Sequence, residues 1–313
     1  MQTISIFWFR RDLRLFDNIG LINALRSPKP VLCLFIFDLN ILNSLDNKKD
    51  ARVEFIYNSL VELNLQLKQY DSSLLVKVGK PIEIFQELIK EYKIESVFTN
   101  EDYEPYAISR DNKIRDLLAS NEIDFKLYKD QVLFAKDEII TNEDQPYTKF
   151  TPYANKWRSL ITPSHYKIKN ELVRNNFFKV TGPQIPSLKS IGFDKSDLNF
   201  PSTKITGTVL KDYHQLRNNP AVEGTSRLGI HLRFGTISIR QLVAEATGKS
   251  EAFLNELIWR EFFMQLLWHY PYVENSCFRK EYNNINWINN EQHFLLWCEG
   301  KTGYPMVDAG MRE

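Results

Sequence analysis

Short apolar runs alternate with amphipathic segments in the N-terminal part of the chain, and this alternation constrains the fold more than any other feature. Runs rich in β-forming residues lie at residues 4–9, 31–37, 74–78 and 95–99. Segments with helical spacing or a helix-start proline follow them, at residues 18–25, 51–69, 81–92 and 107–120. Because such alternation is typical of right-handed βαβ units, the sequence predicts a Rossmann-like α/β domain with an open parallel sheet.

The strand signal disappears beyond Thr203. Helical patterns cover residues 209–218, 238–247, 250–270, 291–299 and 306 onward. Between residues 131 and 203 prolines interrupt the periodicity and one helix is expected at 152–160, where the aromatic side chains favour a segment packed on the domain surface. We therefore predict an α/β domain at residues 1–130, a connector at 131–203 and an all-α domain at 204–313.

Composition excludes several classes of protein. A net charge of +1 provides no bulk field for nucleic acid, so any phosphate binding must come from a local patch. Cys33, Cys277 and Cys298 lack the spacing of a disulfide framework or a metal site, which indicates a reducing compartment. No apolar run is long enough for a membrane span or a signal peptide. We expect a cytoplasmic monomer without a metal ion.

A polar cluster, Arg10 to Arg14 with Asp17 and Asn18, follows the first predicted strand where a dinucleotide-binding fold would carry glycines. One interpretation is a polar turn in which Asp17 or Asn18 caps the next helix. The other is a charged rim at the carboxyl ends of the strands, where open α/β sheets bind ligands.

Two islands between residues 223 and 263 carry the residues best suited to binding. In the first, Thr225 and Ser226 lie between Gly224 and Gly229, with Arg227 beside them. These hydroxyls could simply cap the helix that follows, or they could help to form an anion site for a pyrophosphate.

The second island places four side chains on one helical face, namely Glu256, Trp259, Arg260 and Phe263. A surface ion pair between Glu256 and Arg260 is the simpler interpretation. The apolar flanks and Trp259 between the two charges favour a partly buried pair instead, and a desolvated carboxyl can keep its proton and donate a hydrogen bond.

Four motifs in this order resemble the DNA photolyase/cryptochrome family, and specifically the bacterial cyclobutane pyrimidine dimer photolyases. They are Trp8 to Arg14 with Asp17-Asn18, Pro220 to Leu228, Asn255 to Phe262, and Gly300 to Arg312. The resemblance implies an α/β antenna domain, a connector and a helical domain that binds FAD.

The resemblance also implies roles for individual residues. The positions that match residues holding the FAD are Tyr213, Thr225, Ser226, Arg227 and Leu228, with Gly229 in place of the usual serine and Phe253 where relatives often carry tryptophan. Glu256 matches the glutamate that hydrogen-bonds the dimer, and Trp259 matches the aromatic that packs against the flipped lesion. Arg260 and Phe263 are expected to lie near the DNA, and Trp297 matches the outermost tryptophan of an electron-transfer chain. In the implied reaction, light-excited reduced FAD gives an electron to the dimer in UV-damaged DNA.

The chain departs from the family pattern in two places. Tyr106 and Ala107 stand where folate-binding relatives carry Asn and Glu, so a second antenna chromophore is expected to be a deazaflavin, another pigment or absent. The last motif ends at Glu313, whereas the family continues, so we expect a fragment that by itself binds FAD poorly and repairs no dimers. The alternatives are a cryptochrome-type blue-light photoreceptor and an inactive truncated flavoprotein.

Overall fold

The structure is a computed structural model that describes residues 2–169, 176–180 and 185–312. It forms two compact units, residues 1–271 and residues 272–313. The predicted boundaries at residues 130 and 203 remain predictions, and the predicted connector, 131–203, includes both internal stretches outside the described residues.

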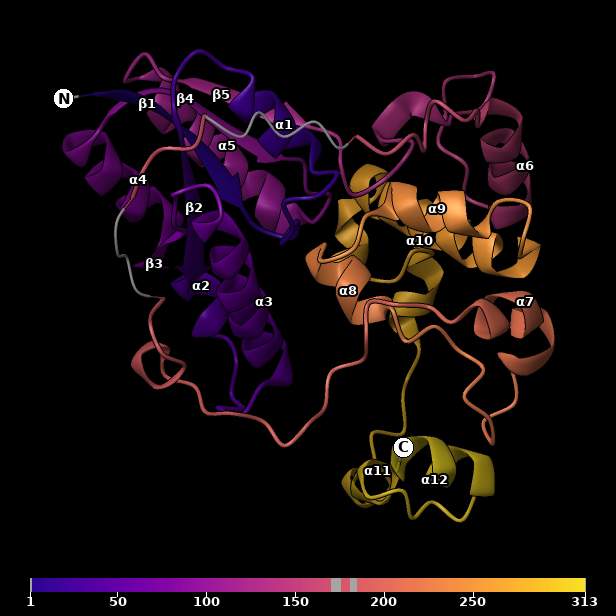
Figure 1. Cartoon of the computed structure of the whole chain (residues 1–313). Coiled ribbons are helices and arrows are strands. Elements are labelled where there is room, and N and C mark those ends of the chain that lie inside the picture. The colour runs from indigo at the N-terminus through magenta and orange to yellow at the C-terminus, as the bar shows by residue number, and fades with distance from the viewer. Residues whose placement is uncertain (1, 170–175, 181–184, 313) are drawn as a thin grey trace. The chain divides into compact units, whose positions relative to one another are not determined.

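Five parallel strands form one sheet in the larger unit (Figure 1). They are β1 (Thr3–Phe9), β2 (Val31–Asp38), β3 (Leu75–Gly79), β4 (Lys93–Asn100) and β5 (Asp124–Tyr128), in the order β3-β2-β1-β4-β5. The α/β fold class and four of the strands were predicted. The edge strand β5 was not, because its five residues include Asp124 and Lys126 and none of them is fully buried.

Helices cover both faces of the sheet, and side-chain alternation along the strands decides which residues face which layer. Phe7 and Phe9 of β1 pack in a core with α1 (Ile19–Leu25) and α3 (Ala51–Lys68). Trp8, between them, points to the other face, where α4 (Pro81–Glu91) and α5 (Pro105–Ala119) pack. A short helix, α2 (Leu39–Leu42), was not predicted.

A second core is built from helices that come later in the chain (Figure 1). Its elements are α6 (Phe150–Leu160), α7 (Gly207–Leu216), α8 (Gly229–Phe234), α9 (Ile239–Ala246) and α10 (Glu251–His269). The long helix α10 is the centre of this group, because α6, α7 and α9 all pack against it. The predicted helices in this region are therefore confirmed, with ends displaced by at most a few residues.

The described part of the connector is packed, as its aromatic content predicted. Helix α6 packs on α10, and the stretch around Phe177 packs on the α/β layer. The side chain of Asn176 donates to the backbone carbonyls of Leu25, Ser27 and Lys29. Phe177 forms a parallel bridge with Val31 and is buried in the core beneath it.

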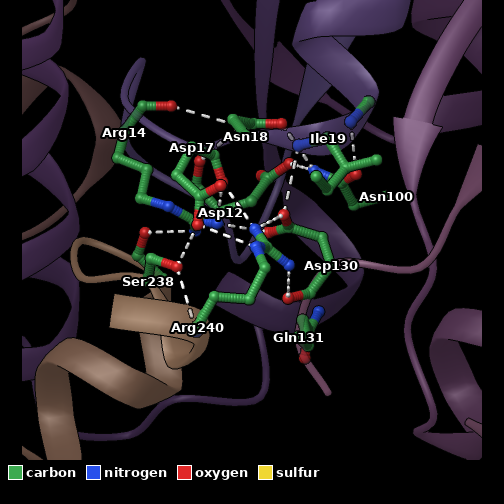
Figure 2. A network of polar contacts seen from close by, with 12 residues as sticks. Asp12, Arg14, Asp17, Asn18, Ile19, Asn100, Asp130, Gln131, Ser238 and Arg240 are labelled. Carbon is green, nitrogen blue, oxygen red and sulfur yellow. Dashed lines mark hydrogen bonds and ion pairs between the residues drawn. The ribbon is translucent and has the colours of Figure 1, made fainter. Parts of the chain in front are cut away.

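Buried charges join the α/β layer to α9, as Figure 2 shows. Arg240 donates to Asp17 Oδ2 and to Asp130 Oδ1, both at 2.7 Å. Arg14 reaches the other oxygen of Asp130, also at 2.7 Å. All four side chains are at least nine-tenths buried. Burial alone would raise the pKa of Asp130, but Arg14 and Arg240 hold it below its usual range.

Part of the polar cluster after β1 therefore has a structural role: Arg14 and Asp17, with Asp130 and Arg240, form a buried joint between the α/β layer and α9. Asn18 caps α1 by accepting a hydrogen bond from Leu21 N at 3.1 Å, which confirms the capping interpretation for Asn18. Asp17 adopts a left-handed φ of 47°. Its carbonyl accepts hydrogen bonds from Arg14 and Arg240, and these contacts hold a conformation that is costly for a non-glycine residue.

The smaller unit contains α11 (Glu291–Cys298) and α12 (Pro305–Arg312), which pack on each other. Asp308 organises the turn before α12 by accepting from the backbone N–H and the hydroxyl of Thr302 and from Gly303 N. None of the helices that the structure describes combines the length and apolar composition that crossing a membrane requires.

Candidate functional site

Helix α10 carries the four-residue face that the sequence singled out. Ser250 caps the helix through Phe253 N, and Leu257 and Ile258 fix its buried side. On the opposite side, Glu256 is partly exposed and Phe263 is 58% exposed, whereas Trp259 and Arg260 are partly buried. The predicted face is thus present as one surface of a well-anchored helix.

Glu256 and Arg260 do not pair with each other, so the predicted i,i+4 ion pair is wrong. Glu256 instead forms a short ion pair with Arg217, at the end of α7. Arg260 donates to the backbone carbonyl of Gln131 at 2.7 Å. The reason is tertiary packing, because α7 and the segment after β5 each bring a closer partner than the neighbouring turn of α10 offers.

Aromatic side chains form a wall next to Glu256. Tyr213 of α7 is 9% exposed and meets Phe253 edge to face at 5.3 Å between ring centroids. Arg217 lies over the Tyr213 ring at 5.8 Å. Burial, followed by the charge of Glu256, raises the pKa of Tyr213, so its hydroxyl is neutral at physiological pH.

The loop between α7 and α8 contains the predicted anion-binding residues. Gly224 is required there, because a Cβ would lie 2.6 Å from the carbonyl oxygen of Leu216. Leu228 is buried in the helical core and anchors the loop, whereas Thr225 and Gly229 are exposed and Ser226 is partly buried. A Cβ added at Gly229 would meet no atom within 4 Å, so there is open space at this backbone.

Arg227 lies in the same loop with a left-handed φ of 50° and pairs with Glu223 at 2.9 Å. The loop therefore offers hydroxyls, an arginine and open backbone beside the aromatic wall. These hydrogen-bond donors fit the phosphates of an aromatic cofactor such as FAD, and the aromatic wall fits its rings. The residues concerned are those that the sequence predicted: Tyr213, Phe253 and the run from Thr225 to Gly229.

Trp259 belongs to an aromatic cluster that the sequence did not predict. Phe150, the first residue of α6, stacks on it with ring centroids 3.5 Å apart and planes inclined by 6°. Phe263 lies 5.4 Å away at 23°, and Phe262 meets the indole edge to face. One face of the indole is thus covered by an aromatic ring from another helix.

Arg260 is partly buried, and its guanidinium donates to the backbone carbonyls of Gln131 and Leu232. Burial lowers its pKa to about 10, and the nearby charges of Arg11 and Arg233 act in the same direction. It still carries its proton at physiological pH, so α10 presents a partly desolvated positive charge toward the segment after β5.

The desolvated carboxyl on α10 is Glu261 rather than Glu256. Glu261 is 3% exposed and accepts hydrogen bonds from Leu133 N, Phe134 N and the indole of Trp157 at 2.6, 3.0 and 2.8 Å. Burial raises its pKa to about 7, although these donors oppose the shift. Its contacts tie the connector to α10.

A cavity of about 210 Å³ opens at the carboxyl ends of β1 and β2, the place expected for a ligand in an open α/β sheet. Apolar residues from β2, α2 and α3 line it, together with Trp8, Tyr106 and Arg110. The Arg110 guanidinium lies 4.8 Å from the Trp8 ring centroid. Tyr106 pairs with Asp38 through its hydroxyl, and burial raises the pKa of Tyr106 to about 12.

In the smaller unit, Trp297 is 44% exposed and stacks on Phe294 at 5.8 Å. Trp287, also in the smaller unit, is 70% exposed. Within the described ranges, no group of three or more His, Cys, Asp or Glu side chains is arranged to hold a metal ion.

Sequence reasoning missed three residues of the site: Arg217, Phe150 and Glu261. Arg217 follows Tyr213 at i+4, so the helical spacing could have placed it on the same face. Glu261 lies among apolar residues of α10, which is a signal for a buried carboxyl. The position of Phe150 against Trp259 has no local signal, because 109 residues separate them along the chain (259 − 150).

Comparison with known proteins agrees with this geometry. Residues 5–170 match the family model of DNA photolyase, and residues 253–313 match the FAD binding domain of DNA photolyase. A deoxyribodipyrimidine photo-lyase from Synechococcus is 34% identical over the whole chain and 70% of its own length.

Solved structures give the same result. An archaeal photolyase from Sulfolobus tokodaii, described with two FAD molecules, is 35% identical with a TM-score of 0.83, and the alignment covers 100% of this chain and 70% of that one. A Synechocystis cryptochrome, 21% identical with a TM-score of 0.82 over 100% of this chain and 71% of its own, shares the fold. The chain therefore belongs to the DNA photolyase family.

Proposed function

We propose that this protein acts in the light-dependent repair of cyclobutane pyrimidine dimers in DNA, with FAD as cofactor. The observation that carries the proposal is the placement of Glu256 and Trp259, one turn apart on α10, beside the wall of Tyr213 and Phe253 and the loop of residues 224–229. A carboxylate and a planar ring next to a cofactor-sized aromatic wall are suited to a flipped pyrimidine pair.

The loop of residues 224–229 and Tyr213 would hold the phosphates and the chain of the cofactor. Exposed backbone and hydroxyls near Arg227 provide donors for a pyrophosphate, and Phe253 provides an apolar surface for its rings. When bound, FAD supplies the photoexcited electron that opens the dimer. Trp297 is proposed as the entry point for the electron that reduces the cofactor.

Other residues would act on the DNA. Glu256 accepts or shares hydrogen bonds with the pyrimidine edges once its partner Arg217 turns toward a phosphate. Trp259 stacks on the lesion, and Arg260 adds a positive charge beneath it. Phe263, the most exposed ring of the cluster, is placed to contact bases beside the lesion.

The cavity at the carboxyl ends of β1 and β2 is proposed as the site of a second, light-harvesting chromophore. Its apolar side suits a planar heterocycle, and its arginines suit an attached phosphate or carboxylate. The free cysteines agree with the proposed cytoplasmic location, and we propose that the protein acts as a monomer.

The test compares duplexes with and without one cyclobutane dimer by fluorescence anisotropy, in the presence of FAD. We expect tighter binding of the damaged duplex and loss of that preference in Trp259→Ala. The matched control is Trp287→Ala, which removes an exposed tryptophan of the smaller unit. Equal affinity of the unaltered chain for both duplexes would overturn the proposal.

A second arm measures repair. Reduced FAD is added in excess, the sample is exposed to blue light, and the remaining dimers are counted with a dimer-specific endonuclease. Loss of dimers only in the light would establish the complete reaction for this chain. It would also refute the expectation that these 313 residues alone repair no dimers.

A further inference from the structure

The stack of Phe150 on Trp259 has the closest and most parallel geometry among the aromatic pairs of α10. Its ring centroids are 3.5 Å apart and its planes differ by 6°, whereas Phe262 meets the same indole at 74°. Most aromatic pairs in proteins adopt offset or edge-to-face arrangements at longer distances. The contact sets the plane of the indole parallel to the ring of Phe150.

Helix α6 is itself held in register with α10. Phe150, Tyr153 and Trp157 lie at i, i+3 and i+7, so they share the face that packs on α10. Trp157 donates to Glu261 at 2.8 Å, and Arg158 lies 3.4 Å from the side-chain oxygen of Asn255. These polar contacts anchor the helix whose first residue is Phe150.

We propose that Phe150 is a positioning residue that holds the Trp259 indole in the orientation needed to stack on a flipped pyrimidine. The inference rests on the proposed function, since it assigns Phe150 a part in recognising the dimer. Phe150 stacks on one face of the ring, and the neighbouring ring of Phe263 lies 5.4 Å from the indole at 23°. The orientation is set before DNA arrives, so less rotamer freedom is lost on binding.

An apolar side chain without a ring at position 150 would keep the packing against Trp259, but it would no longer hold the Trp259 indole in one orientation. Phe150→Leu is therefore expected to lower the preference for damaged over undamaged duplex by about threefold to tenfold, the range for losing one aromatic pair. Affinity for the undamaged duplex should not change. Phe150→Tyr keeps the ring and should restore the preference.

The matched control is Phe200→Leu. Phe200 is also a partly buried connector aromatic, but it packs on Phe55 of α3 rather than on α10. It should leave the preference for damaged duplex unchanged. If Phe150→Leu does not fold, as judged by circular dichroism, Phe150→Met replaces it, because the flexible thioether fills the same space without a ring.

A readout without DNA separates this inference from the proposed function. Hydroxyl-radical oxidation of Trp259, measured by mass spectrometry, should be faster in Phe150→Leu than in the unaltered chain and in Phe150→Tyr. Faster oxidation with an unchanged duplex preference would refute the positioning role. Unchanged oxidation would refute the stack itself. If the unaltered chain shows no preference for the damaged duplex, the proposed function is refuted, and with it the role of Phe150 in recognition. The oxidation result would still show whether Phe150 stacks on Trp259.

Discussion

Replacing Arg240 with methionine tests the buried joint between the α/β layer and the helical core. The change removes a cation that contacts Asp17 and Asp130 at 2.7 Å and leaves both aspartates about 1% exposed. Asp130 keeps Arg14, but the side chain of Asp17 loses its only arginine among the described residues. Breaking a buried ion pair by removing one partner costs about 3–5 kcal/mol, and we expect a loss of this size.

The assay is urea unfolding of the full chain, followed by circular dichroism at several pH values. Lys80→Met is the control, because it breaks an ion pair with Glu83 in which both side chains are more than half exposed. That loss should stay below about 1 kcal/mol. Both variants remove one positive charge, so the difference between their losses of unfolding free energy reports the effect of burying the ion pair.

The pH dependence gives a second check. Because the pKa of Asp130 is lowered in the folded chain, its ionised form stabilises the fold above about pH 4, and this contribution is lost as the pH falls through the lowered pKa. The difference in unfolding free energy between the unaltered chain and Arg240→Met should therefore shrink toward pH 3. A loss below about 1 kcal/mol at pH 7, or a difference that grows on acidification, would refute the reasoning.

Three further predictions concern single residues. Burial raises the pKa of Glu261 from 4.5 to about 7, so its contribution to stability falls as the pH rises through this range, and Glu261→Gln should flatten the measured dependence of unfolding free energy between pH 5 and pH 8. Gly235→Ala should destabilise more than Gly248→Ala in thermal melts, because both glycines have positive φ but only at Gly235 would a Cβ lie 2.2 Å from the carbonyl oxygen of Arg11; equal losses would contradict this. Burial raises the pKa of the Cys33 thiol, so maleimide should label two cysteines in the folded chain and three in denaturant, and labelling of Cys33 under native conditions would contradict its burial.

The elements that sequence predicted correctly are those with strong local periodicity. Strand β2 is buried along its entire length and α3 places its apolar residues at regular helical spacing, so both were predicted within two residues at each end. Strand β5 was not predicted, because it is short, contains charged residues and lies at the edge of the sheet. Its pairing with β4 depends on a neighbour that local pattern cannot reveal.

The candidate site was predictable in composition but not in its pairings. The family resemblance assigned Tyr213, Phe253 and Glu256 to one site. In the structure Tyr213 packs on Phe253, and the charge of Glu256 lies close enough to raise the pKa of Tyr213 after burial. The partner of Glu256 was wrongly predicted as Arg260. Spacing within one helix does not reveal that Arg217, at the end of α7, lies closer in the folded chain. Glu261 was overlooked for the same reason, since its three donors come from the connector.

The joint at Arg240 also has a consequence for biosynthesis. Arg240 lies 223 residues after Asp17 and 110 residues after Asp130 in the chain. At about 5–20 residues per second, a ribosome adds Arg240 roughly 5–20 s after Asp130. Until then Arg14 can pair with Asp130 in the nascent α/β layer, but among the described residues no arginine pairs with the side chain of Asp17. The layer therefore reaches its final stability only after much of the helical segment has been translated, and a ribosome stalled before codon 240 should hold an α/β layer more sensitive to protease than the finished chain.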